Sequence, residues 1–397
     1  MDEYSVPGVY IKESSVLSLS INSSATAIPV FAFEADKPKS TALFVGAVTE
    51  ISSWLDVAAL AAKTLVKDGK PDPEAVKAWQ QEPLYLSLKT YFDNGGGRGY
   101  VVVLDKLTQL VPGLDDVTLL VQAGVKTETF VGAVNTMSLG KTVFWFALFD
   151  GPEGELKDTA AVTALRTKNT YPQTAHGAVY YPWLTADWAV QKDGNTNDGG
   201  TPKYLSIPPS AAVAGAYCTV DRERGVWKAP ANVPVKGGAR PRFKVSDDVD
   251  GACNVPASGG AAINVIREFR GTGPLIWGAR TLNANSDDWR FVPVRRLFSA
   301  AEKDIRSAMG VALFEPNSAP TWERVRSAID IYLHGLWKAG ALMGDTPEQA
   351  YFVRIGLGVT MTASDIENGQ MIVKVGMAAV RPAEFIILEL TQDVVPA

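Results

Sequence analysis

Apolar residues in the first half of the chain alternate between short continuous runs and helical spacing. GYVVVLD at residues 99–105 and TVFWFALF at residues 142–149 are rich in β-branched or aromatic side chains, which is typical of strands covered on both faces. The other segments that the pattern predicts are strands at 42–48 and 178–184 and helices at 54–66 and 83–91. Because such strands and helices alternate, we expect an α/β domain with a mainly parallel sheet.

The pattern changes after this region. Pro208 and Pro209 open an alanine-rich helix that is expected to run to about residue 220, since proline is tolerated in a first helical turn. Gly225 is a natural C-cap for it. Residues 229–262 are rich in Pro, Gly, Ala and Asp, which is typical of a loop or linker. We therefore place the α/β domain, linker included, at residues 25–262.

A second, C-terminal α+β domain is predicted at residues 263–384. Its clearest element is a helix at 320–342, which is followed by Gly344 as a C-cap. The apolar stripe of that helix consists of Trp322, Val325, Ile329, Tyr332, Leu333 and Leu336. The remaining elements predicted here are a helix at 297–309 and strands at 351–357 and 371–377.

The pattern predicts an isolated extended segment at each terminus. Val9, Tyr10 and Ile11 form a short β-type run inside residues 1–24, and residues 385–390 form an apolar strand inside 385–397. Unpaired backbone groups of such strands are costly when buried and adhesive when exposed. We therefore expect each terminal segment to find its sheet elsewhere.

Composition limits the class of protein. The chain has 397 residues, 46% hydrophobic and 20% charged, which excludes general disorder. Its net charge of -5 does not favour nucleic-acid binding. Two cysteines outside any CxxC pattern are typical of a reducing compartment. The N-terminus MDEYSVPGVY has no apolar h-region, and no run approaches the ~18 apolar residues of a membrane span, so we expect cytoplasmic folding without membrane insertion.

Candidate chemistry is sparse. His176 and His334 are the two histidines of the chain, and no GxSxG elbow accompanies either of them. The glycines at 95–97 and 99 precede a strand, whereas a phosphate loop follows one, so they predict a tight turn. No catalytic, cofactor or metal site is therefore expected.

Three charged clusters also have ordinary explanations. SDDVDGA, with Asp247, Asp248 and Asp250, lacks calcium-loop spacing and predicts a solvated loop. The charges at residues 221–224 predict an exposed ion-pair network at a helix end. Arg295 and Arg296 beside aromatic residues are too few to indicate nucleic-acid binding.

Several segments together resemble the contractile tail sheath protein family. The resemblance is strong at residues 7–33 and about 205–390, and weak between 35 and 205, where the outer domain of that family varies. The segments are PGVYIKE (7–13), SATAIPVFAF (24–33), PSAAVAGAYCTVDRERGVWKAPAN (209–232), GPLIWGARTL (273–282), DWRFVPVRRLF (288–298), FEPN (314–317), LWKAGALMG (336–344) and MIVKVGMAAVRPAEFIILEL (371–390).

The resemblance implies a structural, non-enzymatic subunit. It would polymerise helically around an inner tube and contract from a metastable extended state, driving the tube through a target envelope. Residues 25–262 would be the outer domain, and 263–384 the inner domain completed by exchanged terminal strands. The particle would be a phage tail, an R-type bacteriocin or an extracellular contractile injection system, assembled in the bacterial cytoplasm.

The resemblance also implies partners and sites. The partners are other copies of the chain, an inner tube protein, baseplate and terminator or cap proteins, and paralogous sheaths; no cofactor and no nucleic acid is implied. Arg324, Arg326 and Lys338 are candidate tube contacts. The candidates for strand exchange between subunits are Val9, Tyr10, Ile11, Phe385, Ile386, Ile387 and Leu388.

Two other classes stay open from the residues alone. One is an α/β enzyme of hydrolase type, which the missing motifs disfavour. The other is a baseplate component or adhesin acting as a binding module, which the unpaired terminal strands disfavour, because such strands favour assembly with other subunits.

Overall fold

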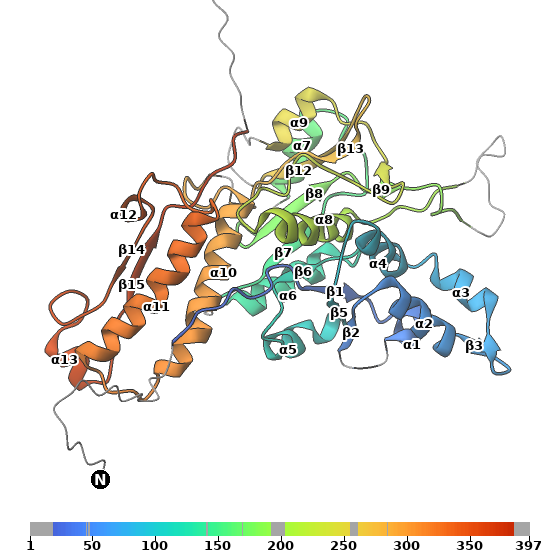
Figure 1. Cartoon of the computed structure of the whole chain (residues 1–397). Helices are drawn as coiled ribbons and strands as arrows, with labels where there is room; N and C mark the ends of the chain where they lie inside the picture. The colour runs from blue at the N-terminus through green and yellow to red at the C-terminus, as the bar shows by residue number, and fades with distance from the viewer. Residues whose placement is uncertain are drawn as a thin grey trace, which may run out of the picture. The chain divides into compact units, whose positions relative to one another are not determined.

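The computed structural model describes residues 19–44, 46, 48–139, 142–168, 170–191, 203–254, 261–283 and 285–384. These residues form two compact units, and α10 (Val292–Met309) contributes to both (Figure 1). The larger unit consists of residues 24–303, 340–343 and 379–384, and the smaller of 19–23, 304–339 and 344–378.

A nine-stranded mixed sheet organises the larger unit, in the order β10-β13-β12-β8-β7-β6-β1-β5-β2. The strands are β1 (Pro29–Phe33), β2 (Thr49–Ile51), β5 (Gly99–Val103), β6 (Leu119–Val121), β7 (Phe146–Asp150), β8 (Gly177–Tyr181), β10 (Val233–Pro234), β12 (Ile263–Phe269) and β13 (Gly273–Ile276). From β5 to β12 neighbouring strands are parallel, and β2, β13 and β10 add antiparallel edges.

Helices cover both faces of this sheet, because alternate side chains of its strands enter two separate cores. Phe31 packs into one core and Val30 into the other. The first core contains residues of α2 (Trp54–Thr64), α3 (Pro73–Trp79), α4 (Pro83–Asp93) and α8 (Pro209–Arg224). The second contains residues of α5 (Leu107–Leu110), α6 (Thr127–Ser138), α7 (Thr159–Thr167) and α9 (Asp247–Asn254).

Helix α8 approaches α4 closely because most of its buried residues are small. A side chain on Gly215 would place its Cβ 2.4 Å from the carbonyl oxygen of Tyr91. The predicted start and end of α8 are confirmed, since Pro209 occupies its first turn and Gly225 has a φ of 91°. The larger unit also has the short helices α1 (Pro38–Leu43), η1 (Leu104–Lys106) and η2 (Val111–Gly113), and the two-stranded pairs β3–β4 (Val66–Lys67, Lys70–Pro71) and β9–β11 (Leu184–Thr185, Arg240–Pro241).

The smaller unit combines a long helix with a two-stranded antiparallel sheet. Its members are η3 (Gly310–Ala312), α11 (Ala319–Lys338), α12 (Pro347–Ala350), β14 (Tyr351–Arg354), α13 (Ala363–Glu367) and β15 (Lys374–Met377). The predicted apolar stripe of α11 is buried at Val325, Ile329 and Leu333. Tyr332 on the same face donates a 2.9 Å hydrogen bond to Asp304 of α10.

Several predicted elements differ from the structure. The described residues of the predicted strand at 42–48 (42–44, 46 and 48) are not a strand. The helix α1 ends there at Leu43, because Pro38 starts a helix whose Lys39 and Ser40 N–H groups donate to the buried Glu82 carboxylate. The α11 helix ends at Lys338 rather than near 342, where Gly340 adopts a φ of 81°. These tertiary hydrogen bonds and this positive φ override the local apolar pattern.

The predicted linker and domain boundary also need correction. Residues 229–262 contain β10, β11 and α9, and the buried Val249 and Cys253 of α9 replace the expected solvated loop. The boundary at 262/263 falls inside the larger unit, because β12 pairs in parallel with β8. The compact units divide instead at Lys303 and Asp304. Within the part of the chain that the structure describes, no helix is long and apolar enough to span a membrane.

Candidate functional site

The two histidines do not form a chemical site. Burial, with the nearby charge of Arg295, lowers the pKa of His176 to about 4, so its ring is neutral near pH 7. The ring of His334 lies 5.3 Å from that of Trp337 on α11. Among the described residues, no cluster of three or more His, Cys, Asp or Glu is arranged to hold a metal ion.

Asp150 is a buried carboxyl group that the sequence analysis did not identify. It ends β7, and burial raises its pKa to about 6. Its carboxylate accepts hydrogen bonds from the backbone N–H of Ser210 at 2.8 Å and of Gly124 at 2.9 Å. Ser210 lies in the first turn of α8, so the carboxylate ties that helix start to the sheet. These bonds give Asp150 a structural role.

The N-terminal segment is held to the larger unit by a buried cluster, which we call the N-terminal anchor: Thr26, Asp221 and Arg296. The Arg296 guanidinium contacts both Asp221 carboxylate oxygens, at 3.0 and 2.6 Å, and donates to the Thr26 carbonyl oxygen at 2.9 Å. The Thr26 hydroxyl also donates to Asp221. Both charged side chains are at most 5% exposed, so the pair is shielded from solvent screening.

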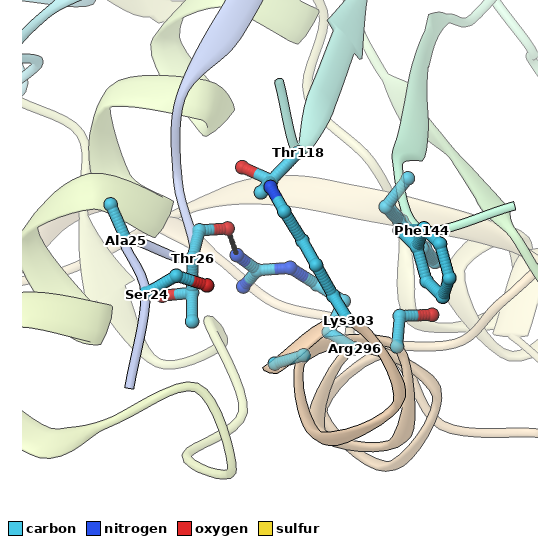
Figure 2. A pocket seen from close by; sticks show the side chains of 10 residues that line it. Ser24, Ala25, Thr26, Thr118, Phe144, Arg296 and Lys303 are labelled. Atoms are coloured by element: carbon cyan, nitrogen blue, oxygen red, sulfur yellow. Dashed lines mark hydrogen bonds between the residues drawn. The ribbon is translucent and has the colours of Figure 1, made fainter. Parts of the chain in front are cut away.

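Figure 2 shows Thr26 and Arg296 of this anchor beside a pocket in which Lys303 extends toward Thr118. The pocket encloses about 10 Å³, which is the space of about one water molecule. An organic ligand does not fit there. The anchor therefore serves to join chain segments.

A similar arrangement holds the last residue that the structure describes. Arg280, 6% exposed, donates from Nε to both carboxylate oxygens of Glu384, at 3.1 and 3.0 Å. The Arg280 guanidinium also donates to the carbonyl oxygen of Asn254. We call Arg280 and Glu384 the C-terminal anchor. Buried arginines thus fix Thr26 and Glu384 to the rest of the larger unit.

Neither anchor is predicted by the sequence. The pattern at residues 221–224 predicts an exposed ion-pair network, whereas the Asp221 side chain is 5% exposed; Arg222, Glu223 and Arg224 are exposed as expected. Arg295 and Arg296 are buried rather than available to nucleic acid. Arg295 lies 4.2 Å from the Trp289 ring. Partners of such arginines are distant in the chain, so local spacing carries no signal for them.

Where the chain is described, β14 and β15 pair only with each other, so each has one edge to which no other named strand is paired. Tyr351 lies opposite Met377, and Arg354 lies opposite Lys374. A two-stranded sheet is marginal by itself, and an unpaired edge is a template for another strand. The predicted exchange residues Val9, Tyr10, Ile11, Phe385, Ile386, Ile387 and Leu388 lie outside the described residues.

The three predicted tube-contact cations lie on α11. Arg324 and Lys338 are exposed, and Arg324 Nε donates to the Pro320 carbonyl oxygen of its own helix at 3.3 Å. Arg326 is half-buried and pairs with Glu323, at 2.9 Å through Nε. The local ion pair neutralises Arg326, which leaves Arg324 and Lys338 as the stronger candidates.

The chain matches a described family and several solved structures. Residues 284–393 match the phage tail sheath C-terminal domain family. The chain is 47% identical to the PVC sheath, from an extracellular contractile injection system in its contracted state; the match covers 99% of each chain with a TM-score of 0.81. It is 39% identical to the helical sheath of the anti-feeding prophage in its contracted state, over 98% of this chain and 99% of that one, with a TM-score of 0.72.

A curated relative is more distant. The tail sheath protein of Vibrio phage KVP40 is 27% identical over 136 residues, which is 34% of this chain. The aligned region spans a fifth of the length of the phage protein. That relative is therefore similar to this chain in one region only.

Proposed function

The chain belongs to the contractile sheath proteins and is a structural subunit of a contractile sheath; from this premise we propose how it assembles and works. Copies polymerise helically around an inner tube. The polymer then passes from a metastable extended lattice to a shorter, wider one and drives the tube through a target envelope. The similarity to two injection-system sheaths over nearly the whole chain supports this function.

Strand exchange joins the copies in this proposal. Residues 9–11 and 385–388 of neighbouring copies add to the β14–β15 sheet, where backbone hydrogen bonds supply affinity and alternating side chains set the register. The observation that carries the proposal is that, in the described part of the chain, this sheet has two strands and each has an edge without a paired strand. A repeated contact of this heterologous kind generates a helix when its rotation does not close.

The two anchors fix where each arm starts. A force on an arm reaches the nine-stranded sheet through Arg296 or Arg280, because each guanidinium is buried and held by several hydrogen bonds. The arms then act as hinges while the larger units move as rigid bodies. The free energy of contraction is stored in the assembled lattice, so no nucleotide is required.

The particle is an injection machine of the extracellular contractile class, assembled in the bacterial cytoplasm. Its further partners are an inner tube protein, baseplate and terminator proteins, and paralogous sheaths. The identity to the PVC and anti-feeding prophage sheaths favours this class over a phage tail.

Arm deletion tests the proposal. Chains lacking residues 1–20 or 385–397 should stay soluble and folded but fail to polymerise, as negative-stain microscopy and circular dichroism would show. Ile387→Pro should act like the deletion, since proline lacks the N–H that a strand donates, while the matched Ile387→Val should polymerise normally. Normal sheaths from either deleted chain would refute arm exchange.

The tube contact has a separate test. Arg324→Glu combined with Lys338→Glu should prevent assembly around the purified tube protein without altering the fold. The control is Arg326→Glu, which lies on the same helix but replaces a cation already paired with Glu323. If Arg326→Glu impairs assembly as much as the double variant does, Arg324 and Lys338 are not the tube contact.

A further inference from the structure

Phe314 is an aromatic side chain in an unusual position. It is fully exposed and adopts a φ of 67°, a conformation that bulky side chains rarely adopt. Val311 and Leu313 beside it are also exposed. We call residues 311–315 the knob. Strained residues of this kind persist where the surrounding structure over-determines them, and they gather at functional sites.

The knob is held in place on its C-terminal side. Asn317 donates from its amide to the Gln370 carbonyl oxygen at 2.9 Å and accepts from the Trp322 indole N–H at 2.7 Å. Within the knob, the Glu315 N–H donates to the Ala312 carbonyl oxygen at 3.3 Å. The aromatic side chain is therefore presented by a preorganised loop, which lowers the entropy lost on binding.

The larger unit has a groove that this feature fits. Residues at the end of α8 and in the following segment enclose about 370 Å³, which is room for an aromatic side chain. Its apolar lining consists of Ala216 and Val220, which are nearly fully buried, and of the half-buried Ala231 and Val233. The segment that carries Ala231 and Val233 is fixed, because the N–H of Asn232 donates to the Ile276 carbonyl oxygen at 2.7 Å.

Cations line the same groove. Arg224, Lys228 and Lys236 contribute three positive charges, and Glu223 contributes one negative charge. Lys228 is half-buried, and the charge of Arg224 adds to burial in lowering its pKa. The groove therefore favours an aromatic face, through cation–π attraction, together with a carboxylate. Phe314 followed by Glu315 offers both groups.

We propose that the knob of one copy inserts into this groove of a second copy, with Phe314 against the apolar surface and Glu315 beside the cations. The proposal rests on the helical homopolymer of the proposed function. It favours another sheath subunit over the tube, because an apolar anchor suits an interface kept within the polymer, whereas contraction must release the tube. A knob and a separate pocket also make a heterologous contact, as a helix requires.

Substitution at Phe314 separates assembly from folding. Phe314→Gly relieves the positive φ, so the subunit should resist urea at least as well as the parent chain. Its critical concentration for polymerisation should nevertheless rise about ten-fold or more, measured by pelleting. The critical concentration of Phe314→Leu should rise less than that of Phe314→Gly. Leu139→Ser, at another exposed apolar position, should behave like the parent chain. A normal critical concentration for Phe314→Gly would overturn the proposal.

Charge reversal identifies the groove. Glu315→Lys and Lys228→Glu should each weaken polymerisation, and the double variant should recover most of it. If the double variant polymerises as poorly as the two single variants, the pairing of Glu315 with Lys228 is overturned. If Phe314→Gly polymerises normally alone and fails only with the tube protein, the tube is the partner and the proposal is wrong.

A disulfide gives a direct test, because both natural cysteines, Cys218 and Cys253, are buried. Chains carrying both Phe314→Cys and Ala231→Cys, assembled well above the critical concentration that loss of Phe314 raises, should yield a ladder of covalent oligomers after oxidation. Each single variant is the control and should yield no ladder. Absence of the ladder in assembled double-variant polymers would refute the contact. Because the arm deletions test polymerisation itself, failure of the knob and failure of the sheath function are distinguishable.

Discussion

Asp221 illustrates how one residue joins distant parts of the chain. Its carboxylate contacts Arg296, 75 residues later, and Thr26, 195 residues earlier. Inside the D-R-E-R run it resembles its exposed neighbours, and only burial distinguishes it. Removing one member of a buried ion pair leaves the other charge without compensation.

We therefore expect Asp221→Asn to lower the free energy of unfolding by about 3–5 kcal/mol, measured by urea denaturation of the arm-deleted, soluble subunit. Glu323→Gln, which breaks the exposed pair with Arg326, is the matched control and should leave the unfolding midpoint unchanged. Similar midpoints for the two variants would show that the anchor does not stabilise the subunit.

His176 predicts a pH dependence. Its pKa is about 4 in the folded state and about 6.5 when unfolded, so the unfolded chain binds the proton more tightly between these values. The stability from the neutral ring is complete above about pH 6.5 and is lost as the pH falls through about 4. His176→Gln should therefore show a smaller loss of urea midpoint between pH 7 and pH 4.5 than the parent chain. An equal loss would contradict this role.

At the scale of elements, packing rather than helix propensity decides whether a glycine inside a helix can be replaced by alanine. Gly215 and Gly132 both lie inside helices, where alanine is intrinsically better by about 0.5–1 kcal/mol. A Cβ at Gly215 would meet the Tyr91 oxygen at 2.4 Å, whereas one at Gly132 meets nothing within 4 Å.

We expect Gly132→Ala to stabilise the subunit by about 0.5–1 kcal/mol and Gly215→Ala to destabilise it by about 1–3 kcal/mol. Urea denaturation of the two variants under identical conditions provides the measurement. Equal effects of the two changes would mean that the α4–α8 contact relaxes without cost.

Elements with strong local patterns were predictable. The helices at Trp54–Thr64 and Pro83–Asp93 and the strand at Gly99–Val103 are confirmed close to their predicted bounds. The strand expected at 42–48 was wrong, since the helix that ends at Leu43 depends on Glu82, a residue remote in the sequence.

At the scale of the whole molecule, the order of strands sets the division into units. The strands β12 and β13 follow the Pro- and Gly-rich segment in sequence, yet they extend the sheet beyond β8. A boundary at residue 262 would remove β12, one of the two parallel neighbours of β8, and with it the buried Ile263, Val265 and Ile266. The backbone edge of β8 would then be unpaired in residues 25–262.

A fragment of residues 24–303 should therefore fold cooperatively and stay monomeric, while residues 25–262 should aggregate. The longer fragment should carry Arg280→Met, because its buried guanidinium would otherwise lose Glu384. Sedimentation and thermal unfolding followed by circular dichroism would compare the two. If residues 25–262 fold cooperatively and stay monomeric, the predicted domain boundary at 262/263 is supported and the division at 303/304 is contradicted.

The sequence by itself determined the fold class, the parallel character of the sheet and the sheath family, because periodicity and family segments are local properties of the chain. Only the tertiary structure decided the end of the larger unit, the burial of Asp221, Arg280 and Arg296, and the exposure of Phe314. Burial depends on what packs against a residue, and those partners lie tens to hundreds of residues away in the chain.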